Sequence, residues 1–269
     1  MAKRVITSLV GLPILIGFVI LGGFWLRVAL LVLSLVGLFE FYRALSGKFL
    51  PIHVSGFLFS VLYFLLIVST VAGDLGHVFL IAAIAAFILV TQAMLVIFYQ
   101  KIEFKDCLIT ICGFFYVSFL FSFIYYVRDY SVYFVWLIFT SASASDTFAY
   151  LVGRKFGHHN LSGTPSPGKT WEGCLGGITG AALVGFLYGY ILYSFVGIDH
   201  PIVLRATAVS VMGAIFSQFG DLFASAIKRS VGIKDFGKVL PGHGGVLDRF
   251  DSIIVAAPVV YIMMIWMLA

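Results

Sequence analysis

The stretch Ser217–Ser252, SQFGDLFASAIKRSVGIKDFGKVLPGHGGVLDRFDS, joins two long apolar runs through a segment rich in charge and glycine. Aspartates, lysines, arginines and a histidine gather in it, although only 11% of the chain is charged. The chain is 61% hydrophobic, and its mean hydropathy is +1.09. A soluble domain is nearer half apolar and a quarter charged. The sequence therefore predicts an integral membrane protein in which this polar stretch has a specific task.

Nine apolar runs flank and precede this stretch, and a helix needs about 20 residues to cross the hydrocarbon core of a bilayer. The runs are Val5–Leu21, Phe24–Leu45, Ile52–Val71, Val78–Tyr99, Cys107–Val127, Ser131–Val152, Cys174–Val196, Ile202–Ile227 and Ser252–Leu268. We expect an all-α polytopic membrane protein with about nine transmembrane helices. The first run is too long for a signal peptide and lacks a small-residue cleavage site, so we expect it to remain as a helix.

The basic residues are distributed unequally between alternate loops. Of the 17 lysines and arginines, 14 fall on the side of the N-terminus, and only Arg27, Arg128 and Arg205 fall on the other side. The positive-inside rule then predicts a cytoplasmic N-terminus and, with nine spans, a C-terminus outside. The net charge of +5 follows from this topology, so we do not expect nucleic-acid binding. We expect the protein in the cell inner (plasma) membrane, with both polar loops, Gly153–Gly173 and Arg229–Arg249, facing the cytoplasm.

Three parts of the chain differ in polar content. Residues 1–75 are predicted to be scaffold or a wall for lipid. Residues 76–152 carry Asp146 and a candidate dimer contact, and residues 153–269 hold the catalytic helices and cytoplasmic loops. The four tryptophans, Trp25, Trp136, Trp171 and Trp266, fall near predicted helix ends, as in an aromatic belt.

Ionisable groups inside predicted spans point to function, because each costs about 3 kcal/mol near the bilayer centre. Glu40 lies beside Arg43, so a local ion pair explains it about as well as function does. Asp146 lies among small polar residues. Asp221 belongs to a helical stripe that recurs every three or four residues. The stripe consists of Ser217, Asp221, Ser225 and Lys228.

The last span opens with Asp248 and Asp251, which could be ordinary partners of a helix N-terminus. The residues Pro241-Gly-His-Gly-Gly245 precede them, and glycine backbone can approach phosphate oxygens closely. Adjacent carboxylates can hold Mg²⁺ on such a phosphate. Nearby cations supply positive charge for an anionic substrate, namely Lys228, Arg229, Lys234 and Lys238.

The segment Gly163–Thr170, GTPSPGKT, matches the G-x-x-x-x-G-K-T pattern of nucleotide-binding P-loops. Pro165 and Pro167 remove two of the backbone donors that such a loop needs, and its flanks are predicted membrane helices. We therefore do not expect a P-loop here. Lys169, with Glu172 at the start of the next span, remains a candidate for a looser nucleotide contact.

A longer pattern resembles a known family. The run from Ser225 through Lys228-Arg229, Lys234-Asp235 and His243-Gly244-Gly245 to Asp248-Arg249-x-Asp251 resembles the C-terminal motif of phosphatidate cytidylyltransferases (CDP-diacylglycerol synthases). Asp146–Tyr150 and Ser166–Gly173 resemble the second conserved region of that family. The resemblance covers about residues 146–252. It departs at Gly168, where a basic residue is expected, and in the Ser/Ala-rich lead-in to Asp146.

The resemblance implies a reaction of CTP with phosphatidate that yields CDP-diacylglycerol and pyrophosphate, with Mg²⁺ and room for a second cation. It also implies a homodimer that works among membrane lipids. The phosphomonoester of phosphatidate has a second pKa of about 6, by analogy with phosphoserine, so it is already an anionic nucleophile at neutral pH. No serine or cysteine nucleophile is needed.

In this hypothesis Asp221 and Asp248 are metal ligands, and Asp146 and Asp251 are additional or outer ligands. Phosphate contacts are assigned to Lys228, Arg229, Arg249 and His243. The remaining substrate-binding residues are Lys169, Glu172, Ser225, Gly244 and Gly245. Two alternatives remain open, a related CTP-dependent lipid kinase or transferase with another acceptor and an ion-coupled transporter. The transporter would use Asp146 and Asp221 as a midplane cation site, but the repeated spans of such proteins are not found.

Overall fold

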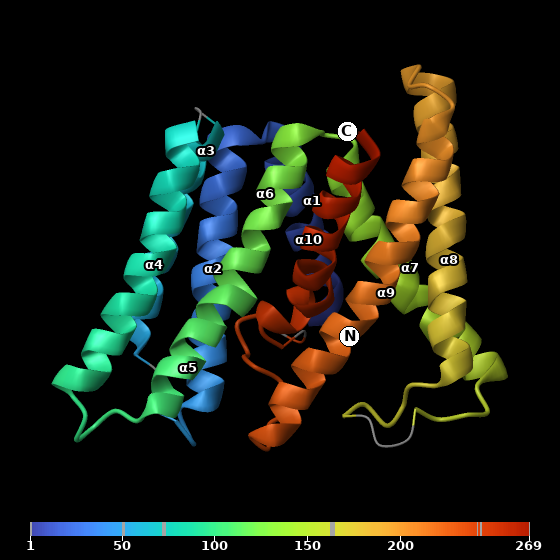
Figure 1. Cartoon of the computed structure of the whole chain (residues 1–269). Helices are drawn as coiled ribbons and strands as arrows, with labels where there is room; N and C mark the ends of the chain where they lie inside the picture. The colour runs from blue at the N-terminus through green and yellow to red at the C-terminus, as the bar shows by residue number, and fades with distance from the viewer. Residues whose placement is uncertain are drawn as a thin grey trace. The chain divides into compact units, whose positions relative to one another are not determined.

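The structure is a computed structural model that describes residues 2–49, 52–71, 74–161, 165–240, 242 and 244–268. Within these ranges the chain is helical apart from short loops and two isolated antiparallel bridges, Asn160–Thr170 and Leu240–Gly244 (Figure 1). The all-α fold class is therefore confirmed. The helices are α1 (Ala2–Leu21), α2 (Gly23–Leu45), α3 (His53–Val71), α4 (Asp74–Ile97), α5 (Phe104–Gly113), α6 (Leu120–Tyr130), α7 (Phe134–Phe156), α8 (Trp171–Ile191), α9 (Pro201–Ser230) and α10 (Leu247–Leu268).

Each of the nine predicted apolar runs coincides with a helical segment of the described chain. A π-helix, Phe114–Phe119, makes α5 and α6 continuous, and a second, Leu192–Val196, extends α8. Seven of these segments, counted over the described residues, are long and apolar enough to cross a membrane. The fully described apolar part of α3, His53–Ile67, is shorter. The chain is a multi-pass membrane protein, while nine crossings and the orientation remain predictions.

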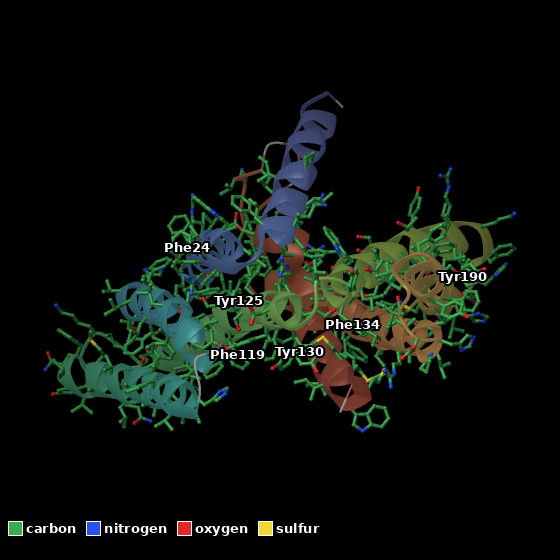
Figure 2. The ribbon with its side chains drawn as sticks, turned by 90° about the horizontal axis from the view of Figure 1, so that it is seen from above. Phe24, Phe119, Tyr125, Tyr130, Phe134 and Tyr190 are labelled. Atoms are coloured by element: carbon green, nitrogen blue, oxygen red, sulfur yellow. The ribbon has the colours of Figure 1, made fainter. Side chains whose placement is uncertain are left out.

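Large aromatic side chains are exposed at several helix ends. Trp25 and Trp171 lie in the first turns of α2 and α8, and Trp266 lies in the last turn of α10. Figure 2 shows Phe24 at the start of α2 and Tyr190 near the end of α8, and both side chains are exposed. These positions agree with the aromatic belt expected of a membrane protein.

The chain packs as two compact units, Met1–Ser122 with Asp235–Asp248, and Phe123–Lys234 with Arg249–Ala269. The three parts drawn from the sequence describe polar content and role rather than packing, and they stay a prediction. The loop 235–248 belongs to the same unit as the N-terminal helices, whereas the rest of α10, from Arg249, belongs to the unit of α7, α8 and α9. The candidate residues are therefore divided between two units, which are described separately below.

In the first unit, α3 and α4 lie side by side (Figure 1), and α2 packs against α3 and α5. The core is aromatic, and Tyr42 of α2 is fully buried in it. The hydroxyl of Tyr42 donates a hydrogen bond to the carbonyl of Thr110 at 2.7 Å. Gly56 and Gly113 make room for its ring, because a Cβ at either position would collide with it. This packing fixes α2, which carries Glu40.

In the second unit, glycines of α8 allow close contact with α7 and α9. A Cβ on Gly177 would lie 2.7 Å from Nε2 of Gln218 on α9 and 2.8 Å from the carbonyl oxygen of Ser145 on α7. A Cβ on Gly180 would collide with the ring of Phe148. Small residues permit such close approach between membrane helices. The loop residues 157–161 and 165–170 lie at the same end of this unit as the C-terminal end of α9 (Figure 1), as alternating helices require.

Candidate active site

A cavity of about 370 Å³ lies in the second unit where α7, α8 and α9 approach one another. Asp146 enters it from α7, and Gln218 and Asp221 enter it from α9. Lys169, in the loop before α8, and Arg154, near the end of α7, supply positive charge to its lining. Three of the predicted site residues, distant in sequence, are thus brought together: Asp146, Lys169 and Asp221.

Lys169 and Asp221 form an ion pair in this cavity. The Nζ atom of Lys169 lies 2.5 Å from Oδ2 of Asp221, and the two side chains are 25% and 33% exposed. Asp146 is close enough to both to interact with them electrostatically. One ammonium group therefore faces two carboxylates, and the negative charge of this cluster exceeds what Lys169 alone can neutralise.

The cluster can be tested for its fit to a cation. Within the described residues, no group of three or more His, Cys, Asp or Glu side chains is arranged to hold a metal by itself. Mg²⁺ is usually held by one or two carboxylates together with water and substrate phosphates, so two carboxylates suffice for a cation that binds with a nucleotide. Asp146 and Asp221 fit that donor set, and Lys169 is paired with Asp221.

Gln218, which sequence reasoning missed, ties the three helices together beside the cavity. Its Nε2 donates to Oγ of Ser145 on α7 at 3.0 Å and to the carbonyl of Cys174 on α8 at 3.1 Å. The available signal was its position on α9, three residues before Asp221 and therefore on the same face.

The loop before α8 holds Lys169 in place by backbone contacts. The amide of Leu161 donates to the carbonyl of Lys169 at 2.8 Å, and the hydroxyl of Thr170 caps α8 by accepting from the amide of Gly173 at 3.1 Å. This segment joins two helices, as expected, and not the strand and helix that a P-loop needs. Gly163 and Thr164 of the P-loop-like pattern lie outside the described residues.

Glu172, a predicted substrate contact, is engaged by the same loop. Its Oε1 lies 2.5 Å from Nδ1 of His159 and accepts from the amide of His159 at 3.2 Å. These contacts fix His159 against the start of α8. A role of Glu172 in substrate binding stays a prediction.

Lys228 and Asp251 form a second, more buried ion pair in this unit. Their charged atoms are 3.9 Å apart, and the side chains are 12% and 9% exposed. The other carboxylate oxygen of Asp251 accepts from the amide of Ser252 at 2.8 Å. The pair joins α9 to α10. The two helices approach closely at Gly220, where a Cβ would lie only 2.6 Å from the carbonyl oxygen of Asp251. These contacts give both residues a structural role beside the predicted one.

Asp248 belongs to the first unit, where it organises the glycine-rich loop. Its Oδ2 accepts from the amides of Phe236 at 2.9 Å and Gly245 at 3.0 Å. Glu40 accepts from the amides of Val246 at 3.1 Å and Leu247 at 2.9 Å. The sequence left Glu40 between a local ion pair and a function. The structure instead makes it a partner of this loop.

The remaining predicted residues are more exposed or lie outside the described chain. Arg229 and Arg249 are exposed, and Ser225 is half-buried. Gly244 has a φ of 88°, a left-handed conformation that favours glycine, and its carbonyl accepts from the amide of Leu240 at 2.9 Å. His243 lies outside the described residues. The shared cation predicted for Asp221 and Asp248 joins residues of different units and stays a prediction.

A family model described as "Cytidylyltransferase family" matches residues 2–267. The chain belongs to the cytidylyltransferase family. The family expected from the motifs is thereby confirmed, and the match extends through the first half of the chain, where no motif was recognised. Membership favours a transferase over the ion-coupled transporter considered from the sequence.

Relatives in this family are similar from end to end. The chain is 31% identical over 265 residues to a phosphatidate cytidylyltransferase of Staphylococcus epidermidis, covering 98% of this chain and 99% of that protein. It is 30% identical over 267 residues to a phosphatidate cytidylyltransferase of Staphylococcus haemolyticus, covering 99% and 100%. A third, from Staphylococcus aureus, is 30% identical over 265 residues, with 98% and 99% covered.

Proposed function

We propose that this protein is a phosphatidate cytidylyltransferase that converts CTP and phosphatidate to CDP-diacylglycerol and pyrophosphate in phospholipid biosynthesis. The observation that carries the proposal is the end-to-end similarity to relatives of that name, at 30 and 31% identity. The cavity lined by Asp146, Lys169 and Asp221 supports it, because carboxylates and a lysine suit a site for phosphates and a cation.

The reaction needs no nucleophile from the protein. An oxygen of the lipid phosphate attacks the α-phosphorus of CTP, and the bond from that phosphorus to the oxygen bridging to the β-phosphate breaks. Pyrophosphate leaves with the bonding electrons. The site must therefore reduce repulsion between two polyanions, align attacking and leaving oxygens, and neutralise charge on pyrophosphate.

Asp146 and Asp221 would hold Mg²⁺ at the cavity, and Asp248 and Asp251 are the proposed further ligands. A bound cation would neutralise nucleotide phosphates and the leaving group. Lys169 would then lose its partner on Asp221 and be released to contact a phosphate. The exchange keeps the carboxylate of Asp221 paired before and after the nucleotide binds, which avoids leaving that charge without a partner in a membrane protein.

Further residues complete the proposed site. Lys228, Arg229, Arg249 and His243 would contact phosphates, and Gly244 and Gly245 would let backbone amides approach them. Ser225, Lys169 and Glu172 would bind the nucleotide. We also propose that the site faces the cytoplasm in the plasma membrane and that the protein is a homodimer, as the basic loops and the family resemblance suggest.

The position of the label in CTP separates the proposal from its alternatives. Purified protein is incubated with Mg²⁺, lipid and CTP that carries the label in either the α- or the γ-phosphate. Cytidylyl transfer puts the α-label into lipid when phosphatidate is supplied and releases the γ-label as pyrophosphate. A CTP-dependent lipid kinase would put the γ-label into a lipid alcohol, and this result would contradict the proposal. Ion flux into liposomes without CTP would instead support a transporter.

A further inference from the structure

Glu40 is a carboxylate buried inside the first unit, where its residue is only 2% exposed. A buried carboxylate is costly unless it receives hydrogen bonds. Oε1 accepts from the amide of Val246 at 3.1 Å, and Oε2 accepts from the amide of Leu247 at 2.9 Å. Both carboxylate oxygens thus bind adjacent backbone groups that are more than 200 residues away in sequence, with a separation of 206 for Val246.

These amides belong to the start of a helix. Helix α10 begins at Leu247, and the first amides of a helix have no partner within it. A serine, threonine, asparagine or aspartate just before the helix normally supplies an acceptor. Val246 stands at that position and cannot do so. Glu40 therefore caps the start of α10 from a different helix, α2, through the amides of Val246 and Leu247 rather than through the later amides that a side chain at position 246 would reach.

The loop is shaped to receive the Glu40 carboxylate. A Cβ on Gly237 would collide with it, and a Cβ on Gly245 would lie 2.5 Å from its oxygens. Asp248 binds the same loop, because its Oδ2 accepts from the amides of Phe236 and Gly245. Gly245 thus contacts both carboxylates, and the described part of the loop is held by Glu40 on α2 and by Asp248 at the start of α10.

We propose that Glu40 is a positioning residue that sets the backbone of the glycine-rich loop and the start of α10. It would thereby fix the direction of Asp248 for cation binding and of the amide of Gly244 for phosphate binding. This inference rests on the proposed function for its catalytic consequence, but its structural consequence concerns the loop alone.

The test replaces Glu40 by glutamine, which has almost the same shape. One of its two terminal atoms becomes an NH₂ donor that faces a backbone amide, so one hydrogen bond of the cap is lost. Asp106→Asn is the matched control. Asp106 is also only 2% exposed, and its Oδ2 accepts from the amide of Glu103 at 2.8 Å at the start of α5.

We expect Glu40→Gln to accelerate hydrogen–deuterium exchange in the peptide covering residues 235–248. Turnover of CTP should fall by about 10-fold or more, the cost of removing a group that orients a ligand. Asp106→Asn, compared at equal thermal stability, should neither accelerate exchange in residues 235–248 nor lower CTP turnover in this way. Wild-type exchange and turnover in Glu40→Gln would overturn the inference, as would losses that match those of Asp106→Asn.

A second variant disrupts the contact between Glu40 and the loop by changing the loop instead of Glu40. Gly245→Ala should reproduce the faster exchange, since its methyl group displaces the carboxylate of Glu40. In the double variant Glu40→Ala/Gly245→Ala, exchange should be no faster than in Glu40→Ala alone, because the effects of substitutions at contacting sites are not additive. Full additivity would count against the contact. The exchange measurement uses no CTP or lipid, so it stands or fails independently of the proposed reaction.

Discussion

The ammonium nitrogen of Lys169 lies 2.5 Å from Oδ2 of Asp221, so a loop lysine neutralises a helix aspartate within the cavity. The second carboxylate of the cavity, Asp146, comes from another helix. A divalent cation bound to Oδ2 of Asp221 would compete with this lysine. The competition between the lysine and a cation is the basis of two predictions.

Replacing Asp221 by asparagine removes the charge and keeps the shape. Loss of a residue that only orients a metal ligand typically costs about 10- to 100-fold in activity. We expect CTP turnover with phosphatidate to fall by more than this, because Asp221 is proposed to bind the metal directly. The control is Asp199→Asn, an exposed acid in the loop before α9, which should keep wild-type turnover. Near wild-type turnover of Asp221→Asn in folded protein would refute the metal assignment.

Asp248→Ala should likewise abolish turnover.

Lys169→Met should separate cation binding from catalysis. Without the ammonium, the two carboxylates repel each other, so Mn²⁺ binding without nucleotide should tighten, as followed by the loss of the free Mn²⁺ signal in electron paramagnetic resonance. Turnover should fall because a phosphate contact is lost. Lys105→Met, which removes a lysine 2.7 Å from Glu103 outside the cavity, serves as control. Weaker Mn²⁺ binding in Lys169→Met would contradict the competition.

The pair Lys228–Asp251 allows stability and function to be separated. Lys228→Met removes the ion-pair partner of the buried Asp251 carboxylate and should lower the free energy of unfolding by on the order of 3 kcal/mol. The double variant Lys228→Met/Asp251→Asn should regain most of this stability in thermal unfolding, yet stay deficient in turnover. Turnover that recovers together with stability would show a purely structural pair and remove both residues from the proposed site.

Gly177→Ala tests the packing that brings Asp146 and Asp221 together. The added Cβ would lie 2.8 Å from the backbone carbonyl oxygen of Ser145, so the backbones of α7 and α8 must move apart. We expect a loss of about 1–3 kcal/mol, typical of overpacking, seen as a lower unfolding temperature in detergent. Gly17→Ala in α1, where nothing lies within 4 Å of the new Cβ, should be neutral. Equal effects of the two substitutions would contradict this account.

The helices were predictable from the sequence because each one carries a long apolar run. Their ends were less predictable, since hydropathy detects burial in lipid and not the helix itself. The predicted run beginning at Val78 belongs to a helix that begins at Asp74, and α10 begins at Leu247 rather than Ser252. At Ser131 the reverse occurs, because its hydroxyl accepts from the amides of Tyr133 and Phe134 and the helix begins only at Phe134.

The site was predictable where a charged side chain in a membrane protein had no ordinary explanation, as for Asp146 and Asp221. Gln218 was missed because a neutral amide in an apolar helix gives a weak signal. The partners of Glu40 could not be read from the sequence, since they are backbone amides separated from it by about 200 residues. No residue type marks a backbone donor, so this contact required the fold.

Helix α9 contains 30 residues and is therefore about 45 Å long, whereas the hydrocarbon of a bilayer is about 30 Å thick. Its last turns carry Lys228 and Arg229, so we expect this end to pass among the glycerol and phosphate groups of one leaflet. A lipid acceptor could then react without being extracted from the bilayer, and only the nucleotide would need to travel. Bilayer thickness would set how far this end extends beyond the hydrocarbon core. The acyl-chain length of the surrounding lipids would therefore affect turnover even when the acceptor lipid is unchanged.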